Sequence, residues 1–259
     1  MNGFLVILKA ELFSLFISPA TYVASFYFLS LLAFGFRFFI ESFAASDWIL
    51  PPLSSLALGL ILGGPALIPF LTMRSFAEER RLGTLETLMS APISSVSLVY
   101  GKWTASYLFF CFVAVCAFCF PLILWICFPD QGEGLGFQNF EQWAGSGIFL
   151  LTFGGSFSAI GIFSSSITKN QMVAGMLSFT LLTLYLSLMA LSFGESHQSD
   201  SIVGVSSFLK SCMGSMYDGL NKLQNFSVGL VEISTIFHQI AVIIYFLSLA
   251  TLQVERLKH

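Results

Sequence analysis

The stretch RSFAEERRLGTLETLMSAPIS, residues 74–94, is a polar segment in a very apolar chain. The 259 residues include 11 basic and 14 acidic side chains, and six of these charges fall within this one stretch. Moving one charged residue to the centre of a bilayer costs at least about 2.5 kcal/mol, so six would cost about 15 kcal/mol before any pairing. We therefore expect the stretch to lie outside any hydrocarbon layer.

The composition around this stretch identifies the class of protein. Hydrophobic residues make up 56% of the chain, charged residues only 10%, and the mean hydropathy is +0.85. An ordinary soluble domain carries about 25% charged residues. Because so few polar side chains cannot cover a water-facing surface, the sequence predicts an integral membrane protein.

Six charge-free intervals are long enough to cross a bilayer, which takes about 20 apolar residues. The intervals are 12–36, 49–73, 103–129, 142–168, 170–194 and 233–254. They predict an all-α, polytopic membrane protein with six transmembrane helices in a single domain, residues 1–259. The first span should begin near Pro19, since proline is tolerated in the first turn of a helix. The preceding residues 4–16 are too short for another span and predict an interfacial helix.

The basic residues predict the orientation, because cytoplasmic loops carry an excess of lysine and arginine. With six spans both termini lie on one side, which then holds eight basic residues and is expected to be cytoplasmic. These eight are Lys9, Arg74, Arg80, Arg81, Lys102, Lys169, Arg256 and Lys258. The other side holds three, Arg37, Lys210 and Lys222.

Two further patterns bear on packing and on the external side. The external segment 195–232 carries apolar residues at helical spacing around 208–216, which predicts short amphipathic helices before span six. Gly59 with Gly63, and Gly155 with Ala159, are small-residue pairs that allow close helix approach. Packing within the chain and contact between subunits both remain open for these pairs.

The polar stretch itself predicts two short helices. Ser75 to Glu78 has the sequence of a capping box, and Gly83 suits a left-handed helix stop. Thr84 can cap a second helix, which Pro92 would end. The second helix would set Leu85, Leu88 and Met89 along one face, as a docking surface requires. A helical hairpin on the inner leaflet is the alternative.

No complete catalytic motif is present. Gly101-Lys102 resembles the end of a phosphate-binding loop, but Val96 and Trp103 replace the required glycine and serine or threonine. The three histidines have no metal-ligand spacing, so neither a metal nor a cofactor is expected.

Ser146 and His238 raise the alternative of an intramembrane serine protease, although Ala144 replaces a glycine of the rhomboid-type motif. A structural anchor that recruits a cytoplasmic partner is a third hypothesis.

The segment EERRLGTLETLMSAPIS resembles the signature of type 2 ABC exporter permeases, through Glu79, Gly83-Thr84, Glu86 and Pro92. Four other segments resemble the same family: LKAELFSLFISPATYV (8–23), YGKWTASYL (100–108), SSSITKNQMVAG (164–175) and NFSVGLVEISTIFHQIAVIIYFLSLA (225–250). The similarity extends over nearly the whole chain and is greatest to permeases associated with gliding motility. It carries no information on the cargo.

This resemblance implies a permease subunit that is not itself an enzyme and binds no nucleic acid. A separate cytoplasmic ABC ATPase would hydrolyse ATP, and two permease chains, identical or different, would form the path. The protein would lie in the bacterial inner membrane with both termini in the cytoplasm, and its external helices would form an outer gate.

The resemblance also implies which residues meet the ATPase. The coupling hairpin would contribute Glu78, Glu79, Arg80, Arg81, Gly83, Thr84, Leu85, Glu86, Leu88, Met89 and Pro92. A second cytoplasmic contact would be formed by the turn Thr168, Lys169, Asn170 and Gln171.

Overall fold

The computed structural model describes residues 3–44, 52–85, 94–127, 140–191 and 233–258. Every secondary-structure element in these ranges is a helix, which agrees with the predicted all-α class. The helices are α1 (Gly3–Ile17), α2 (Pro19–Ala44), α3 (Pro52–Thr72), α4 (Ala77–Leu82), α6 (Ser95–Cys127), α8 (Phe140–Ile167), α9 (Gln171–Leu191) and α11 (Ile233–Lys258). The external segment 195–232 lies outside the described residues.

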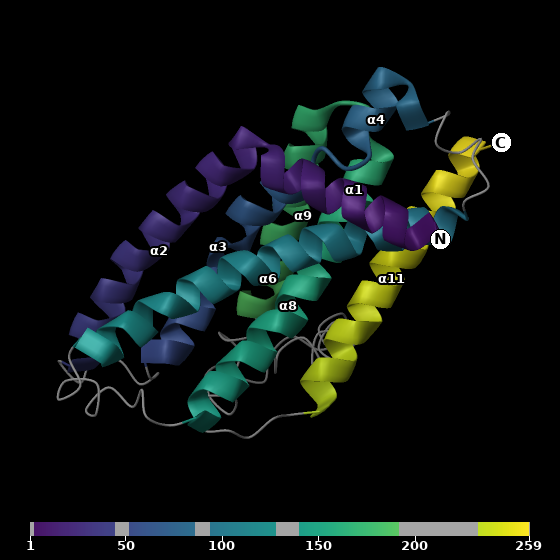
Figure 1. The fold of residues 1–259 in the computed structure, drawn as a ribbon. Helices are drawn as coiled ribbons and strands as arrows, with labels where there is room; N and C mark the ends of the chain where they lie inside the picture. The colour runs from purple at the N-terminus through teal and green to yellow at the C-terminus, as the bar shows by residue number, and fades with distance from the viewer. Residues whose placement is uncertain (1–2, 45–51, 86–93, 128–139, 192–232, 259) are drawn as a thin grey trace, which may run out of the picture.

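Helix α8 occupies the centre of the bundle and packs against α3, α6, α9 and α11 (Figure 1). Its middle is rich in glycine, serine and alanine, and these small residues are buried. Small side chains let neighbouring helix backbones approach closely, and this packing needs no hydrophobic driving force inside a membrane. At Gly154, for example, a Cβ would come within 2.1 Å of the Phe110 ring of α6.

Five helices of the described part are long and apolar enough to cross a membrane. They are Pro19–Glu41, Leu53–Leu82, Ser95–Cys127, Phe140–Ile167 and Ile233–Leu257. The remaining predicted span, 170–194, coincides with α9, whose apolar part Gln171–Ser187 is shorter. The structure thus supports a polytopic all-α membrane protein, while a sixth span stays a prediction.

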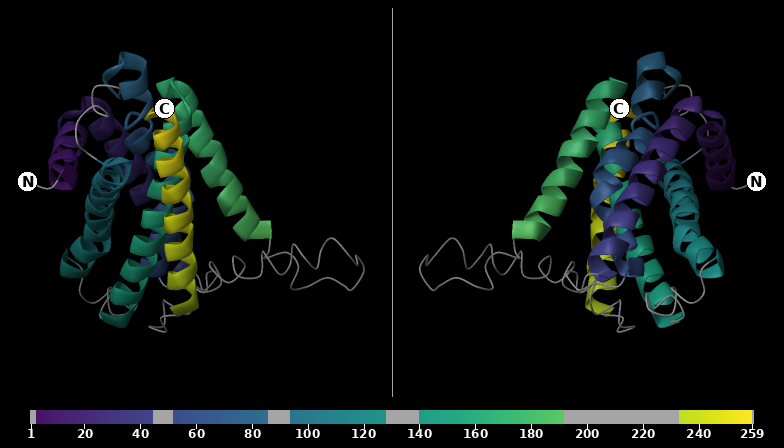
Figure 2. Two further views of the ribbon diagram at one scale, coloured as in Figure 1. Left: turned by 90° about the vertical axis from the view of Figure 1, so that its right-hand side faces the viewer. Right: turned by 90° about the vertical axis from the view of Figure 1, so that its left-hand side faces the viewer.

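The first predicted helix boundary is confirmed, because α1 ends at Ile17 and α2 begins at Pro19. Helix α1 crosses the face of α6 near the end of the bundle that carries α4 (Figure 1). The C-terminus lies toward this same end, as both side views show (Figure 2). On α2, large apolar side chains such as Val23, Phe26 and Phe34 are exposed, as expected of a surface that faces lipid.

Both small-residue pairs serve packing inside the chain. A Cβ on Gly63 would meet the Phe28 ring at 2.4 Å, and one on Gly59 would meet Leu32 at 3.2 Å, so this face of α3 is covered by α2. Gly155 faces Ile243 of α11 and Tyr107 of α6. The sequence left open whether these glycines contact the same chain or another subunit, and the structure shows that they contact helices of the same chain.

Candidate coupling site

The polar stretch begins with α4, whose start is capped differently from the prediction. The N-cap residue is Phe76, and it makes no side-chain capping hydrogen bond. Instead the Ser165 hydroxyl of α8 accepts hydrogen bonds from the Phe76 and Ala77 amides, at 3.1 and 3.2 Å. The predicted Ser75–Glu78 capping box is therefore wrong. A serine 89 residues away along the chain from Phe76 takes its place, and sequence-local rules cannot detect such a partner.

The end of α4 follows the prediction. Gly83 has φ 73° and ψ 2°, the left-handed conformation that glycine adopts without steric penalty. A Cβ at Gly83 would meet nothing within 4 Å, so only the backbone conformation favours glycine there. The Thr84 hydroxyl donates to the Glu79 carbonyl at 3.3 Å and so ties the reversed chain back to α4.

Leu85 is buried in a cluster with Phe76, Leu98, Ile162 and Leu247, rather than presented to a partner. This part of the expected docking face therefore belongs to the protein's own core. Glu86, Leu88, Met89 and Pro92 lie outside the described residues.

Arg80 joins the two predicted contact segments. Its Nη1 donates to the carbonyl oxygens of Ser166 at 2.8 Å and Thr168 at 3.4 Å, at the C-terminal end of α8. Carbonyl groups at a helix C-terminus have no intrahelical partner and carry partial negative charge, which favours a cation there. Arg80 thereby holds α4 beside the turn 168–171.

That turn is short and well defined. The Asn170 side-chain oxygen accepts the Met172 amide at 3.0 Å, which caps the start of α9. Lys169 and Asn170 are exposed, as are Arg81 and Gly83 in the α4 segment. The described residues of the two predicted contacts, in α4 and in the turn 168–171, consequently lie side by side at one end of the bundle.

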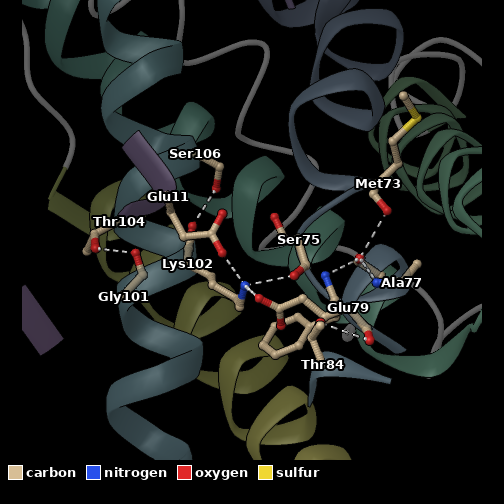
Figure 3. Close-up of polar contacts among 12 residues, drawn as sticks. Glu11, Met73, Ser75, Ala77, Glu79, Thr84, Gly101, Lys102, Thr104 and Ser106 are labelled. Carbon is tan, nitrogen blue, oxygen red and sulfur yellow. Dashed lines mark hydrogen bonds and ion pairs between the residues drawn. The ribbon is translucent and has the colours of Figure 1, made fainter. Parts of the chain in front are cut away.

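A buried ion cluster fixes the inner side of α4 (Figure 3). Lys102 of α6 is only 1% exposed, and its ammonium contacts carboxylate oxygens of both Glu11 and Glu79, the latter at 2.7 Å. The same nitrogen donates to the Ser75 carbonyl at 2.8 Å and lies 5.2 Å from the centre of the Phe76 ring. All three N–H donors of the ammonium are thus used, and the ring adds a cation–π contact.

Lys102 and Glu11 were not assigned a role from the sequence. A signal existed, because Lys102 is the one charged residue of the apolar helix α6, Glu11 lies in the apolar helix α1 with only Lys9 as a charged neighbour, and buried charges must be paired. What the sequence could not supply was the pairing, since Glu11 and Lys102 are 91 residues apart. Glu79 was expected in the partner contact, but its carboxylate points inward to Lys102.

Residues 38–212 match the family described as ABC-2 family transporter protein. The match covers more than half of the chain and includes the α4 segment and the turn 168–171. The chain belongs to the ABC-2 transporter family. No curated protein matches it.

An ABC-2 family protein is the membrane subunit of an ABC transporter, so this chain is a multi-pass permease. Membership agrees with the expectation that the chain is not itself an enzyme, and the family implies an ABC ATPase as partner. The Ser146 hydroxyl, considered above for a protease, lies 3.4 Å from the Ser54 hydroxyl in the buried interface of α8 and α3.

Proposed function

We propose that this ABC-2 permease is an exporter subunit that works as a dimer and is driven by a separate cytoplasmic ABC ATPase. Residues 75–90 would dock in a groove of that ATPase, with the turn 168–171 as a second contact. Two permease chains would form the translocation path. The positive-inside pattern supports a cytoplasmic position for both termini and for α4, in a bacterial inner membrane.

The observation that carries this proposal is the arrangement at the α4 end. Arg80 fastens α4 to the carbonyls of residues 166 and 168, so α4 and the turn form one surface. Lys102 and Ser165 fasten the inner side of the same segment. A hairpin that merely rests on the inner leaflet has no need of such anchorage. A segment that receives force from a partner must be attached firmly to the helices it moves.

The outward side of the segment gives the most direct mutational test. Gly83→Leu forces a leucine into the left-handed conformation, which costs about 1 kcal/mol or more. Arg81→Glu and Glu86→Lys reverse charges expected to face the partner, and like charges across an interface weaken binding. Each variant should insert normally but retain less ATPase on co-purification and lose ATP-driven transport more than abundance.

Matched controls lie away from the proposed surface. Gly35→Leu also adds a side chain where nothing lies within 4 Å, but in a helix without positive φ. Glu41→Lys reverses an exposed charge toward the other end of α2. Both controls should co-purify the ATPase at wild-type levels. If Gly83→Leu and Glu86→Lys also kept full ATPase binding and turnover, the coupling assignment would fall.

A further inference from the structure

Helix α1 is connected to the α4 segment by charged side chains as well as by packing. Glu11 of α1 and Glu79 of α4 share the ammonium of Lys102 from α6. Two carboxylates repel each other, so each can stay close to the other only while the cation lies between them. The second carboxylate oxygen of Glu79 is buried and has no hydrogen-bond partner among the described residues. The position of Glu79 therefore depends on Lys102.

The residue before Lys102 allows α1 to reach this point. A Cβ on Gly101 would lie 2.9 Å from a side-chain carbon of Ile7 and 3.6 Å from the Phe4 carbonyl, both in α1. Because Gly101 has no side chain, α1 can pack closely against α6 next to Lys102. Gly101 and Lys102 thus act together, because Gly101 leaves room for α1 and Lys102 binds Glu11 of α1.

A second contact joins the same segments. Arg74, between α3 and α4, donates from Nη1 to the Ser18 hydroxyl at 2.8 Å, and its Nε pairs with Glu78 at 3.1 Å. Ser18 is the single residue between the end of α1 and the start of α2. The α4 segment therefore holds α1 at Glu11 and also holds the joint through which α1 continues into α2.

We propose that Lys102 is a positioning residue that ties α1 to α4 through Glu11 and Glu79, so that movement of the coupling segment passes to α1 and, at Ser18, to α2. This inference rests on the proposed coupling function of α4. It gives the interfacial helix a mechanical role: α1 moves with the coupling segment. It also explains why an apolar helix that packs on α6 carries a carboxylate at its middle.

The test measures the distance between α1 and α4 in the full chain reconstituted in lipid nanodiscs. Spin labels on cysteines at positions 10 and 81, both exposed, report this distance in a background without native cysteines. Wild type should give one narrow distance distribution. Lys102→Met and Glu11→Gln should broaden it, because α1 is released, and Glu11→Gln is the milder variant since Glu11 is partly exposed.

A charge exchange separates positioning from simple loss of packing. Glu79→Lys alone puts two cations beside one carboxylate, whereas Glu11→Lys, Glu79→Lys and Lys102→Glu together invert all three charges and place one carboxylate between two cations. The triple variant should recover the narrow distribution that Glu79→Lys loses, as coupled neighbouring sites do in a mutant cycle. Arg37→Gln, at an exposed ion pair, should leave the distribution unchanged.

The same variants are then assayed with the ATPase. Glu11→Gln should retain normal ATPase binding, because Glu11 lies inward of the docking surface, but reduce ATP turnover per complex by about fivefold, within the usual range for coupling between sites. A wild-type chain that bound no ATPase would contradict the proposed function. An unchanged distance distribution in both Lys102→Met and Glu11→Gln would overturn this inference, regardless of the ATPase binding and turnover that these variants show.

Discussion

Two ion-paired regions of the molecule have opposite characters. Toward one end of α2, Arg37 pairs with Glu41 at 3.0 Å, but both belong to the same helix and their side chains are 78% and 62% exposed. At the α4 end, Lys102 is 1% exposed and pairs with carboxylates from two other segments. The first pair joins neighbours one helical turn apart, whereas the second joins three separate elements.

The difference shows where charge determines structure in this protein. An exposed ion pair contributes little to stability. Its charges are screened by the surroundings, and the entropy cost of holding two long side chains in place offsets most of the electrostatic gain. A buried cation has lost its hydration and depends on its partner carboxylates, and removing Lys102 leaves both Glu11 and Glu79 without a compensating charge. The buried cluster therefore fixes the position of α4, whereas loss of the exposed pair would leave the fold nearly unchanged.

The largest effect should come from Lys102→Met, which leaves Glu11 and Glu79 facing each other. We expect the free energy of unfolding, measured by steric trapping in micelles, to fall by about 3 kcal/mol. The triple variant Lys102→Met, Glu11→Gln, Glu79→Gln removes the repulsion and should recover most of this loss. A triple variant no more stable than the single one would mean that packing, and not charge, holds the cluster.

An intermediate effect is expected at the cap of α4. Ser165→Ala removes the shared acceptor of the Phe76 and Ala77 amides, and leaving buried amides unpaired should cost about 1 to 2 kcal/mol. Ser156→Ala is the matched control, because this buried α8 hydroxyl donates only to the Phe153 carbonyl of its own helix among the contacts described. Equal losses of unfolding free energy in the two variants would contradict the capping role.

The smallest effect should come from the exposed pair. Arg37→Gln is expected to change the unfolding free energy by less than about 0.5 kcal/mol, since the pair is an exposed contact between residues one turn apart. The same micelle measurement checks it, alongside ATPase co-purification. A loss as large as that of Lys102→Met would remove the distinction between the two regions.

Much of the fold was predictable because membrane helices follow local rules. Charge-free length located the long apolar helices, proline marked the start of α2, and glycine marked the end of α4. The family was also predictable, because Glu79, Gly83-Thr84, Glu86 and Pro92 occur in the same order as in the family's signature. The association with gliding motility remains a prediction from similarity alone.

The anchorage of α4 was not predictable for a physical reason. Ser165, Arg80 and Lys102 act on partners more than 20 residues away along the chain, and only the folded bundle brings them together. The predicted capping box was chemically reasonable, but the Ser165 hydroxyl of α8 occupies the site where the local cap would act. Leu85 likewise fits an outward stripe by periodicity, whereas tertiary packing buries it.

The most direct test of the account is photo-crosslinking from α4 in membranes that contain the native ATPase. A photoreactive residue at position 81, exposed on α4, should form an adduct with the ATPase, and Gly83→Leu should reduce its yield. The same residue at position 140, at the start of α8 and 79% exposed, should form none because it lies at the opposite end of the bundle. No ATPase adduct from position 81, or an equal yield from position 140, would contradict the assignment of α4 as the coupling element.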